Sequence, residues 1–345
     1  MKLVLATNHL GLGGSESYLI TVAEQFDRLG HEVAIYSPEH AGGVAAARER
    51  GIEVIPEGEE PPADFDAALV QDAGVSYELR EANPTAPQVF VAHSESFDLQ
   101  APPQLAGASV GVVVALNDRV ADRARSYAAA TEVVRLRQPI DTERFTPAAP
   151  LPDVARRALL LSNTPHADRM RALEAACAEA GIELLRLGGR EGQTTDPRQA
   201  IAGVEIVIGY GRSILEGMAC GRAAYVYDWH GGDGWVTADS YAAIEADGFG
   251  GRSGRMTITP ERLAADLRLY APEMGPVNHD LVMARHRANV HAQQLLELFR
   301  RLAPVPVPAS PLPPLQEIAR LVRLEWRARA DVHALTAENA HLHHR

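Results

Sequence analysis

The fold is indicated most clearly by one stretch of the sequence, Ile206-Val-Ile-Gly-Tyr-Gly-Arg-Ser-Ile-Leu-Glu-Gly-Met-Ala-Cys-Gly-Arg222. Its apolar start completes a predicted buried strand over Val204–Ile208, and the glycines at 209 and 211 predict a tight turn after it. The residues that follow predict a helix over Ile214–Gly221, with Ser213 as its cap. A strand, a glycine turn and a helix in this order form the repeating unit of a parallel α/β sheet.

Polar residues stand where this strand ends. In open parallel sheets, ligands bind beyond the carboxyl ends of the strands, which makes Gly211, Arg212 and Ser213 candidate binding residues. Glu216 lies in the first turn of the predicted helix, where the helix dipole favours a carboxylate that can face the cleft. Simple charge complementarity at a helix start is the alternative explanation for Glu216.

The same alternation of short apolar runs and longer Ala-rich helical patterns extends on both sides of this stretch. Before the proline-rich break at 147–152, strands are predicted at Leu3–Thr7, Val33–Ser37, Glu53–Pro56, Ala67–Gln71, Gln88–Ala92, Val110–Ala115 and Glu132–Leu136. After it, strands are predicted at Ala158–Leu161, Glu183–Leu187 and Ala223–Tyr227, and one long helix over Asp280–Leu302. The sequence therefore predicts an α/β protein of two doubly wound parallel-sheet domains, residues 1–147 and 153–302, that face a cleft.

The end of the chain has a different composition. Residues 303–314 include six prolines and predict an extended linker. Residues 315–345 predict a helical tail whose apolar heptad positions, interrupted at Glu325 and Ala328, line one face. Two interpretations stay open: an amphipathic helix that folds back on the body of the protein, or a coiled coil that joins two copies into a homodimer.

A glycine-rich turn follows the first predicted strand, in Asn8-His-Leu-Gly-Leu-Gly-Gly-Ser-Glu-Ser17. Gly13 and Gly14 let the backbone approach a ligand closely, and the start of the next helix attracts an anion such as a diphosphate. A dinucleotide fingerprint is disfavoured, because Glu16 stands where its last glycine belongs and the second strand lacks an acidic end. A tight turn without a ligand is the other alternative.

Two more strand ends carry candidate residues. His93 follows the Gln88–Ala92 strand and is a candidate catalytic residue, although a lone histidine is more often structural. Arg169 and Arg171 open a helix after the Ala158–Leu161 strand. There they either meet a phosphate or face solvent.

An unusual loop, Asp228-Trp-His-Gly-Gly-Asp-Gly-Trp235, follows the Ala223–Tyr227 strand. Its glycines suit backbone donors to sugar or phosphate oxygens, which indicates contacts with substrate. Asp228 and His230 are candidate catalytic residues, and Gly231, Gly232 and Asp233 are candidate binding residues. A metal site on Asp228, His230 and Asp233 is the alternative.

Composition narrows the function classes. The 345 residues carry 33 basic and 45 acidic side chains, a net charge of −12, and Lys2 is the only lysine. A Walker-type phosphate loop, a Schiff base and a kinase ion pair are excluded, since each needs a lysine. The acidic balance argues against nucleic acid as a partner. Cys177 and Cys220 suggest neither a disulfide nor a zinc site. Without a signal-peptide pattern or an apolar run long enough to span a bilayer, we expect a soluble cytoplasmic protein that is not integral to the membrane, with peripheral association as an option.

Three segments in order resemble the retaining nucleotide-sugar glycosyltransferases of the GT-B fold, in the large family marked by two glutamates separated by seven residues. Gly13-Gly-Ser-Glu16, with Leu29-Gly-His-Glu-Val33, is similar to the family's Gly-Gly-x-Glu turn and Gly-His-Glu-Val strand entry. Gln138-Pro-Ile-Asp-Thr-Glu-Arg-Phe-Thr-Pro147 is similar to the segment that closes the first domain. The run from Gly209 to Gly221 is similar to Glu-Gly-Phe-Gly-x-x-x-x-Glu-Ala-Met-Ala-Cys-Gly, of which it lacks the first residue.

The resemblance covers roughly residues 1–300 and implies transfer of a sugar, with retained configuration, from a nucleotide sugar to a glycan, lipid-linked or small-molecule acceptor. It gives Glu216 the donor ribose, Gly13 and Gly14 the diphosphate, and His93 a place beside the reacting sugar. It implies neither a metal nor a cofactor, since basic side chains and helix ends stabilise the leaving diphosphate.

Two departures from the family pattern keep other functions open. Ile208 stands where the first glutamate belongs, and the family's second-domain lysine has no counterpart. Asp228, His230 or Asp233 is a candidate to replace the glutamate, and Arg169 the lysine. The alternatives are a catalytically degenerate relative that binds a nucleotide sugar or a partner chain, and a sugar-nucleotide epimerase of similar fold.

Overall fold

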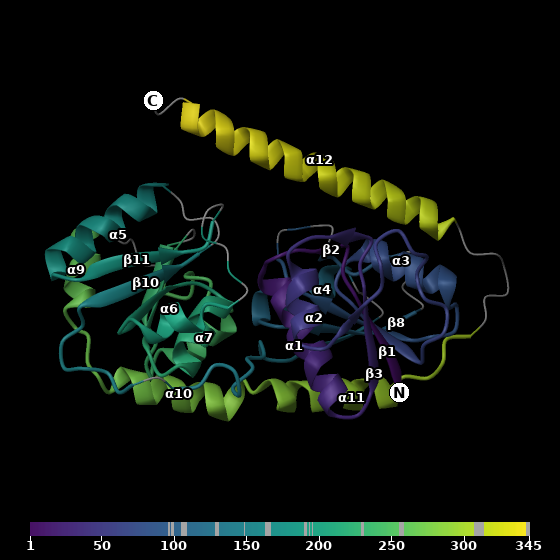
Figure 1. The fold of residues 1–345 in the computed structure, drawn as a ribbon, viewed down its shortest axis with the longest axis horizontal. Coiled ribbons are helices and arrows are strands. Elements are labelled where there is room, and N and C mark those ends of the chain that lie inside the picture. Colours follow the sequence, from purple (N-terminus) through teal and green to yellow (C-terminus); the bar gives the residue numbers. More distant parts are fainter. Residues whose placement is uncertain are drawn as a thin grey trace.

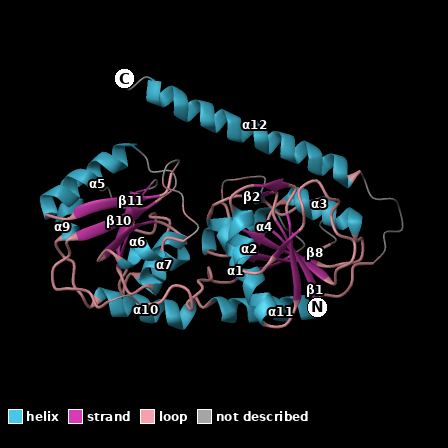
Figure 2. Cartoon of the chain, viewed as in Figure 1, coloured by secondary structure: helices cyan, strands magenta, loops and turns pink. Residues whose placement is uncertain are grey.

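The chain folds into two lobes, each built on one sheet, as the ribbon in Figure 1 and the cartoon in Figure 2 show. The computed structural model describes all residues except 96, 98–99, 105–108, 128–130, 148, 163–166, 190–191, 193, 195, 229–230, 255–258, 307–313 and 343–345, and except the side chains of 167, 228 and 333–342.

The first lobe has a seven-stranded sheet in the order β5-β3-β1-β6-β7-β8-β9, in which every neighbouring pair is parallel. Its strands are β1 Lys2–Ala6, β3 Glu32–Tyr36, β5 Glu53–Val54, β6 Ala67–Val70, β7 Gln88–Ala92, β8 Val110–Ala115 and β9 Glu132–Arg135. A small separate pair joins β2 His9–Leu10 to β4 Glu39–His40. The strand order reverses between β3-β1 and β6-β7, so the first sheet is doubly wound, as predicted.

Helices cover both faces of the first sheet. On one face lie α1 Gly14–Arg28, α2 Gly43–Glu49 and α11 Ala288–Arg301, and on the other α3 Ala73–Ala82 and α4 Asp118–Tyr127. Side chains alternate between the two cores: Leu3 and Leu5 of β1 face α1, whereas Val4 faces the α3 side.

The second lobe has a five-stranded sheet in the order β11-β10-β12-β13-β14. Its strands are β10 Arg157–Leu161, β11 Glu183–Leu187, β12 Ile206–Gly209, β13 Ala223–Asp228 and β14 Gly231–Trp235. One face packs on α6 Arg198–Ala202, α7 Arg212–Ala219, α8 Tyr241–Ala246 and α10 Met274–Arg285, and the other on α5 Ala167–Ala180 and α9 Pro260–Leu267. Both lobes are therefore α/β sandwiches with a parallel core.

The predicted loop after β13 is wrong in part, because Gly231–Trp235 form an antiparallel edge strand. The Trp235 ring meets the Tyr225 ring edge-on at 5.0 Å, and its indole N–H donates to the Asp266 carbonyl over 2.7 Å. These contacts fix the hairpin although three of its residues are glycines, whose low strand propensity favoured a loop.

The predicted single helix over Asp280–Leu302 is also wrong, since α10 ends at Arg285 and α11 starts at Ala288. At the break, the Ile140 amide donates to the His286 carbonyl over 2.7 Å, and the Ala288 amide donates to the Ile140 carbonyl over 2.9 Å. Bonds to a distant segment thus replace the helical ones. After the break α11 returns to the first lobe, where Leu295 and Phe299 join its core.

The helical tail forms α12, Leu315–Leu342, and its first half folds back on the first lobe. Leu315 and Ala319 are fully buried with Tyr77 of α3, and Trp326 lies with its ring centroid 5.2 Å from that of His9. In Figure 1, α12 starts beside α3 and runs toward the second lobe, on the side opposite α10 and α11. Within the described part of the chain, none of the helices combines the length and apolar content that crossing a bilayer requires.

Candidate functional site

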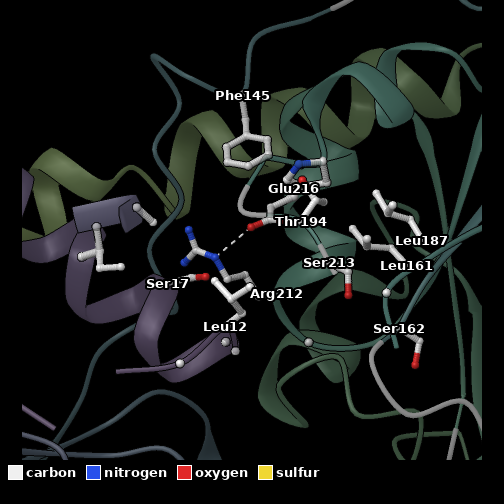
Figure 3. Close-up of a pocket in the computed structure, with 18 of the residues that line it drawn as sticks. Leu12, Ser17, Phe145, Leu161, Ser162, Leu187, Thr194, Arg212, Ser213 and Glu216 are labelled. Carbon is white, nitrogen blue, oxygen red and sulfur yellow. Dashed lines mark hydrogen bonds and ion pairs between the residues drawn. The ribbon is translucent and has the colours of Figure 1, made fainter. Parts of the chain in front are cut away.

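A cavity of about 220 Å³ opens between the lobes, at the carboxyl ends of the second-lobe strands (Figure 3). We call it the interlobe cavity. Its lining combines the start of α1, the ends of β10 and β11, and the turn into α7: Gly11, Leu12, Gly13, Gly14, Ser17, Ile20, Ala46, Arg50, Phe145, Leu161, Ser162, Leu187, Gly188, Thr194, Pro197, Tyr210, Gly211, Arg212, Ser213 and Glu216. Six predicted binding residues, Gly13, Gly14, Gly211, Arg212, Ser213 and Glu216, are thus brought together from distant parts of the chain.

The turn into α7 depends on glycine. Gly211 is the N-cap of α7 with φ 58°, a left-handed conformation that favours glycine. A Cβ on Gly209 would lie 2.8 Å from the Leu161 carbonyl oxygen, closer than packing allows. The predicted cap at Ser213 is wrong, because its hydroxyl donates to the Tyr210 carbonyl over 2.9 Å. With no side-chain cap, the first amides of α7 are left for a ligand in the cavity.

Arg212 and Glu216 form the charged centre of the interlobe cavity (Figure 3). One turn apart on α7, they pair over 2.8 Å between Nε and Oε1. Arg212 also donates to the Pro139 carbonyl over 3.0 Å and, across the cleft, to the Thr21 hydroxyl over 3.3 Å. Burial raises the pKa of the Glu216 carboxyl, and the Arg212 charge opposes that rise. Glu216 is thus a buried carboxylate held by one cation, with acceptor capacity for a polar ligand.

The first-lobe wall is the glycine turn before α1. Gly13 is the N-cap of α1 in extended conformation, and no side chain caps it. A Cβ on Gly13 would collide with the Glu16 carboxylate, which lies over the turn, whereas one on Gly14 would meet nothing within 4 Å. Because this carboxylate is the far end of a flexible side chain and the Gly13 backbone is extended, sterics require a glycine at neither position. Neither α1 nor α7 begins with a side-chain cap hydrogen bond, so their first amides at the two walls of the cavity suit an anion.

Arg50 lines the same cavity and was missed by the sequence analysis. It caps the carboxyl end of α2, so it belongs to no strand-end motif, and no spacing pattern pointed to it. Its guanidinium pairs with Glu24 over 3.3 Å. Burial lowers the Arg50 pKa, and the neighbouring charge of Arg144 lowers it further.

His93 lies at the first-lobe edge, outside the residues that line the interlobe cavity. Its ring meets the Tyr18 ring edge-on at 5.0 Å, and its buried Nε2 has no hydrogen-bond partner among the described residues. Burial, with the charge of Arg212 as the second cause, lowers the pKa of His93 to about 3. The imidazole is therefore neutral at physiological pH.

Other polar groups gather at the same edge, where β1 and β6 end. Asp72 accepts from the Thr7 hydroxyl over 2.9 Å and from the Asn8 amide over 2.8 Å, and burial raises its pKa to about 6 despite these bonds. The buried side-chain oxygens of Asn8 and Gln71 have no donor in the described part of the chain. Unsatisfied buried acceptors favour a ligand that brings hydroxyl groups.

The remaining predicted site residues lie elsewhere. Arg171 is exposed and pairs with Asp168, and neither it nor Arg169 lines the interlobe cavity. Gly231 and Gly232 are buried in β14, and the Asp233 carboxylate accepts from the Gly254 amide over 2.8 Å. His230 and the side chain of Asp228 lie outside the described residues. Among described side chains, no three His, Cys, Asp or Glu gather so that they could hold a metal ion.

The surroundings of Ile208 suit an apolar residue at the position where the family has its first glutamate. It is fully buried in the second-lobe core, on the sheet face that packs against α5 and α9. A carboxylate there would need a partner inside an apolar core, where an unpaired charge is strongly destabilising. The strand position therefore acts in packing.

Ion pairs join the lobes beside the cavity. Arg135 of β9 pairs with Glu245 of α8 over 2.6 Å, and Arg119 pairs with Asp247. Arg252 reaches Glu95, in the segment that follows His93. Ion pairs thus connect the two edges directly.

Comparisons with known proteins agree with this architecture. No protein-family model matches the chain, and none of the curated proteins matches it. Among solved structures, Anabaena HepE in complex with UDP and glucose has a TM-score of 0.63 at 12% identity, covering 88% of this chain and 100% of that chain. A glycosyltransferase from Rickettsia africae has a TM-score of 0.58 at 15% identity, covering 87% of this chain and 98% of that chain. Sucrose-phosphate synthase from Thermosynechococcus elongatus has a TM-score of 0.55 at 13% identity, covering 87% of this chain and 99% of that chain. At such identities the likeness concerns architecture: the chain has the two-lobed GT-B fold that the sequence predicts.

Proposed function

We propose that the protein is a glycosyltransferase that moves a sugar from a nucleotide-sugar donor to an acceptor with retained configuration. The observation that carries the proposal is the interlobe cavity, which combines two uncapped helix starts, Arg212 and the buried Glu216. HepE, a protein of similar fold, has been solved with UDP, and with UDP-glucose. Retention follows from the motif resemblance.

The groups in the cavity suit a nucleoside diphosphate. Glu216 accepts hydrogen bonds from the two ribose hydroxyls, while the amides of Gly13, Gly14 and the first turn of α7 bind phosphate oxygens. When the sugar leaves the diphosphate, negative charge grows on the leaving oxygen, and Arg212 with the helix starts stabilises it. We therefore propose that the reaction needs no metal and no cofactor.

The acceptor binds at the first-lobe edge in this proposal. Neutral His93 donates or accepts a hydrogen bond beside the reacting sugar, and the free oxygens of Asn8 and Gln71 receive acceptor hydroxyls. A glycan, a lipid-linked sugar or a small polyol has such hydroxyls. The candidate Asp228 is the last residue of β13 and the candidate His230 follows it in the sequence, and we retain both as groups for the donor sugar.

The test is a nucleotide panel in thermal-shift assays. UDP, GDP or one of their sugar adducts should raise the melting temperature, because a ligand that binds only the folded state stabilises it. Absence of a shift with every nucleotide would sink the proposal. With the nucleotide known, donor and acceptor screens follow the product by mass and its anomeric configuration by NMR.

Ile208 favours a second candidate, a catalytically degenerate protein that binds a nucleotide sugar. The position that carries the first glutamate in the family is apolar and buried here, so one contact to the donor sugar is lost. Tight nucleotide binding without transfer or hydrolysis across the screen would support this candidate. Conversion of the sugar nucleotide without any acceptor would instead identify an epimerase.

For the tail we propose self-association through its outer face. Leu321, Leu324 and Val332 are exposed on α12, by 53%, 46% and 61%, while the docked face is covered by α3. Sedimentation of the full chain should give the mass of a dimer, and the variant that combines Leu321→Ser, Leu324→Ser and Val332→Ser, which keeps the docked face, should be a monomer. Equal masses would remove the proposal.

A further inference from the structure

Two guanidinium groups reach the interlobe cavity from opposite lobes. Arg212 starts α7 in the second lobe, and Arg50 ends α2 in the first. Within the described part of the chain, these are the basic residues that line the cavity. The charge of Arg212 is one of the causes that lower the Arg50 pKa, which shows that the two cations lie in each other's field.

The contacts of Arg50 leave most of its donors unused. The guanidinium has five N–H donors, and the described residues give it one hydrogen bond, to Glu24 over 3.3 Å. Glu24 also accepts from Arg28 over the shorter distance of 2.6 Å, so its charge is shared between two cations. Arg212, by contrast, makes three hydrogen bonds. Arg50 is therefore the less satisfied cation at the cavity.

The charge balance of the lining points the same way. Arg212 and Glu216 neutralise each other as a pair, whereas Arg50 shares its partner Glu24 with Arg28 and is the less neutralised charge of the cavity. Two helix starts add partial positive charge from both walls. An anion with several oxygens, such as a diphosphate, would satisfy both guanidinium forks and the free amides at once.

We infer that Arg50 binds the diphosphate of the nucleotide sugar opposite Arg212, so that each lobe supplies one arginine. This deepens the proposed function and rests on it. Lys2 cannot supply the charge, because it lies at the opposite, amino end of β1 and pairs there with Asp64 and Glu32. Since the two arginines come from different lobes, the diphosphate also ties the lobes together.

The experiment measures affinity by titration calorimetry along the series uridine, UMP and UDP, or along the guanosine series if GDP is the nucleotide that raises the melting temperature. Arg50→Gln should weaken the diphosphate by about ten- to a hundredfold and change the nucleoside by less than about twofold. Arg48→Gln is the matched control. Arg48 is exposed on the same helix, so its loss should leave the whole series unchanged.

Two further variants separate ligand binding from folding. Glu24→Gln breaks the Arg50–Glu24 pair but keeps the guanidinium at the cavity, so UDP should bind as in the wild type. Arg50→Lys keeps the charge without the planar fork and should recover part of the affinity. Equal losses for uridine and UDP in Arg50→Gln, or an unchanged UDP affinity, would overturn the inference alone. A wild type that binds no nucleoside diphosphate would overturn the proposed function together with it.

Discussion

The two edges that face the cleft differ in how their polar groups are satisfied. At the second-lobe edge, Arg212 and Glu216 pair with each other, and Gly211 shapes the helix start around them. At the first-lobe edge, His93 and Gln71 have buried atoms that no described residue bonds, and Asp72 has a raised pKa. The charged side chains of the second-lobe edge are thus paired without a ligand, and backbone amides of α7 are left for one. The first-lobe edge instead carries unsatisfied side-chain atoms, which suit a ligand rich in hydroxyls. In the proposed function, the ribose is recognised at the second-lobe edge, the acceptor at the first-lobe edge, and the diphosphate by groups of both lobes.

The largest test of this division is His93→Ala. If His93 serves the acceptor side, transfer should fall by about a hundred- to ten-thousandfold, since that is what a positioned acid–base group contributes. Nucleotide affinity, measured by calorimetry, should stay unchanged because the side chain lies outside the interlobe cavity. A parallel loss of nucleotide affinity would mean that the two edges are not separate in function.

The next effect concerns pH, because burial lowers the pKa of three histidines: His93 at the first-lobe edge, His286 at the break between α10 and α11, and His291 in α11. Burial lowers the pKa of His93 and His291 to about 3 and of His286 to about 4. Below about pH 6.5 the imidazoles of the unfolded chain bind protons, whereas the buried imidazoles of the folded chain stay neutral. The free energy of unfolding therefore decreases as the pH falls. Between pH 7.5 and 5.5 each histidine should cost roughly 1.4 kcal/mol.

The titration of Asp72 has the opposite effect on stability, which gives the measurement a second variant. Its folded pKa of about 6 exceeds the unfolded value of 3.8, so protonation favours the folded state as the pH falls. Its contribution over the same interval is roughly 1 kcal/mol, smaller than that of the three histidines together. Urea unfolding at the two pH values should therefore show a net loss at pH 5.5. In Asp72→Asn the loss should grow, and a chain equally stable at both values would contradict the burial of the imidazoles.

Glu216→Gln tests the second-lobe edge at a smaller magnitude. The amide keeps the shape but loses the charge-assisted bond to Arg212 and weakens the acceptor for ribose hydroxyls. Nucleoside and diphosphate should both bind about tenfold more weakly. Glu273→Gln, on an exposed residue beside α10, is the control. A variant that loses affinity for the diphosphate but not for the nucleoside would move Glu216 away from the ribose.

The smallest expected effect is that of Arg169→Gln with Arg171→Gln. Both arginines lie outside the interlobe cavity, and Arg171 is an exposed surface residue paired with Asp168. The affinity for UDP should change by less than about twofold, as for most surface ion pairs. A tenfold loss would show that α5 closes over the ligand in the bound state.

The periodicity of apolar residues and the placement of glycines predicted the fold correctly. The prediction failed at elements whose ends depend on tertiary contacts. The strand Ile206–Gly209 and helix α7 follow from apolar runs and the Gly-Tyr-Gly turn. All six residues predicted to bind at the α7 and α1 starts line the interlobe cavity. The hairpin at Trp235 and the break at His286 depend on partners far away in sequence, which periodicity cannot show. Arg50 had no local signal at all.

The path of the chain has a consequence for engineering. The chain enters the second lobe after Ile140 and leaves it at Arg287, and these two residues form a bridge with each other. In chain terms the second lobe is an insert, with its two ends fastened at one point of the first. Such an insert can be exchanged as one unit. The segment between Ile140 and Arg287 would be replaced by the second lobe of another protein of this fold, and the first-lobe core, including α11, would stay intact. Under the proposed function, such an exchange would change the donor that is used and keep the acceptor surface.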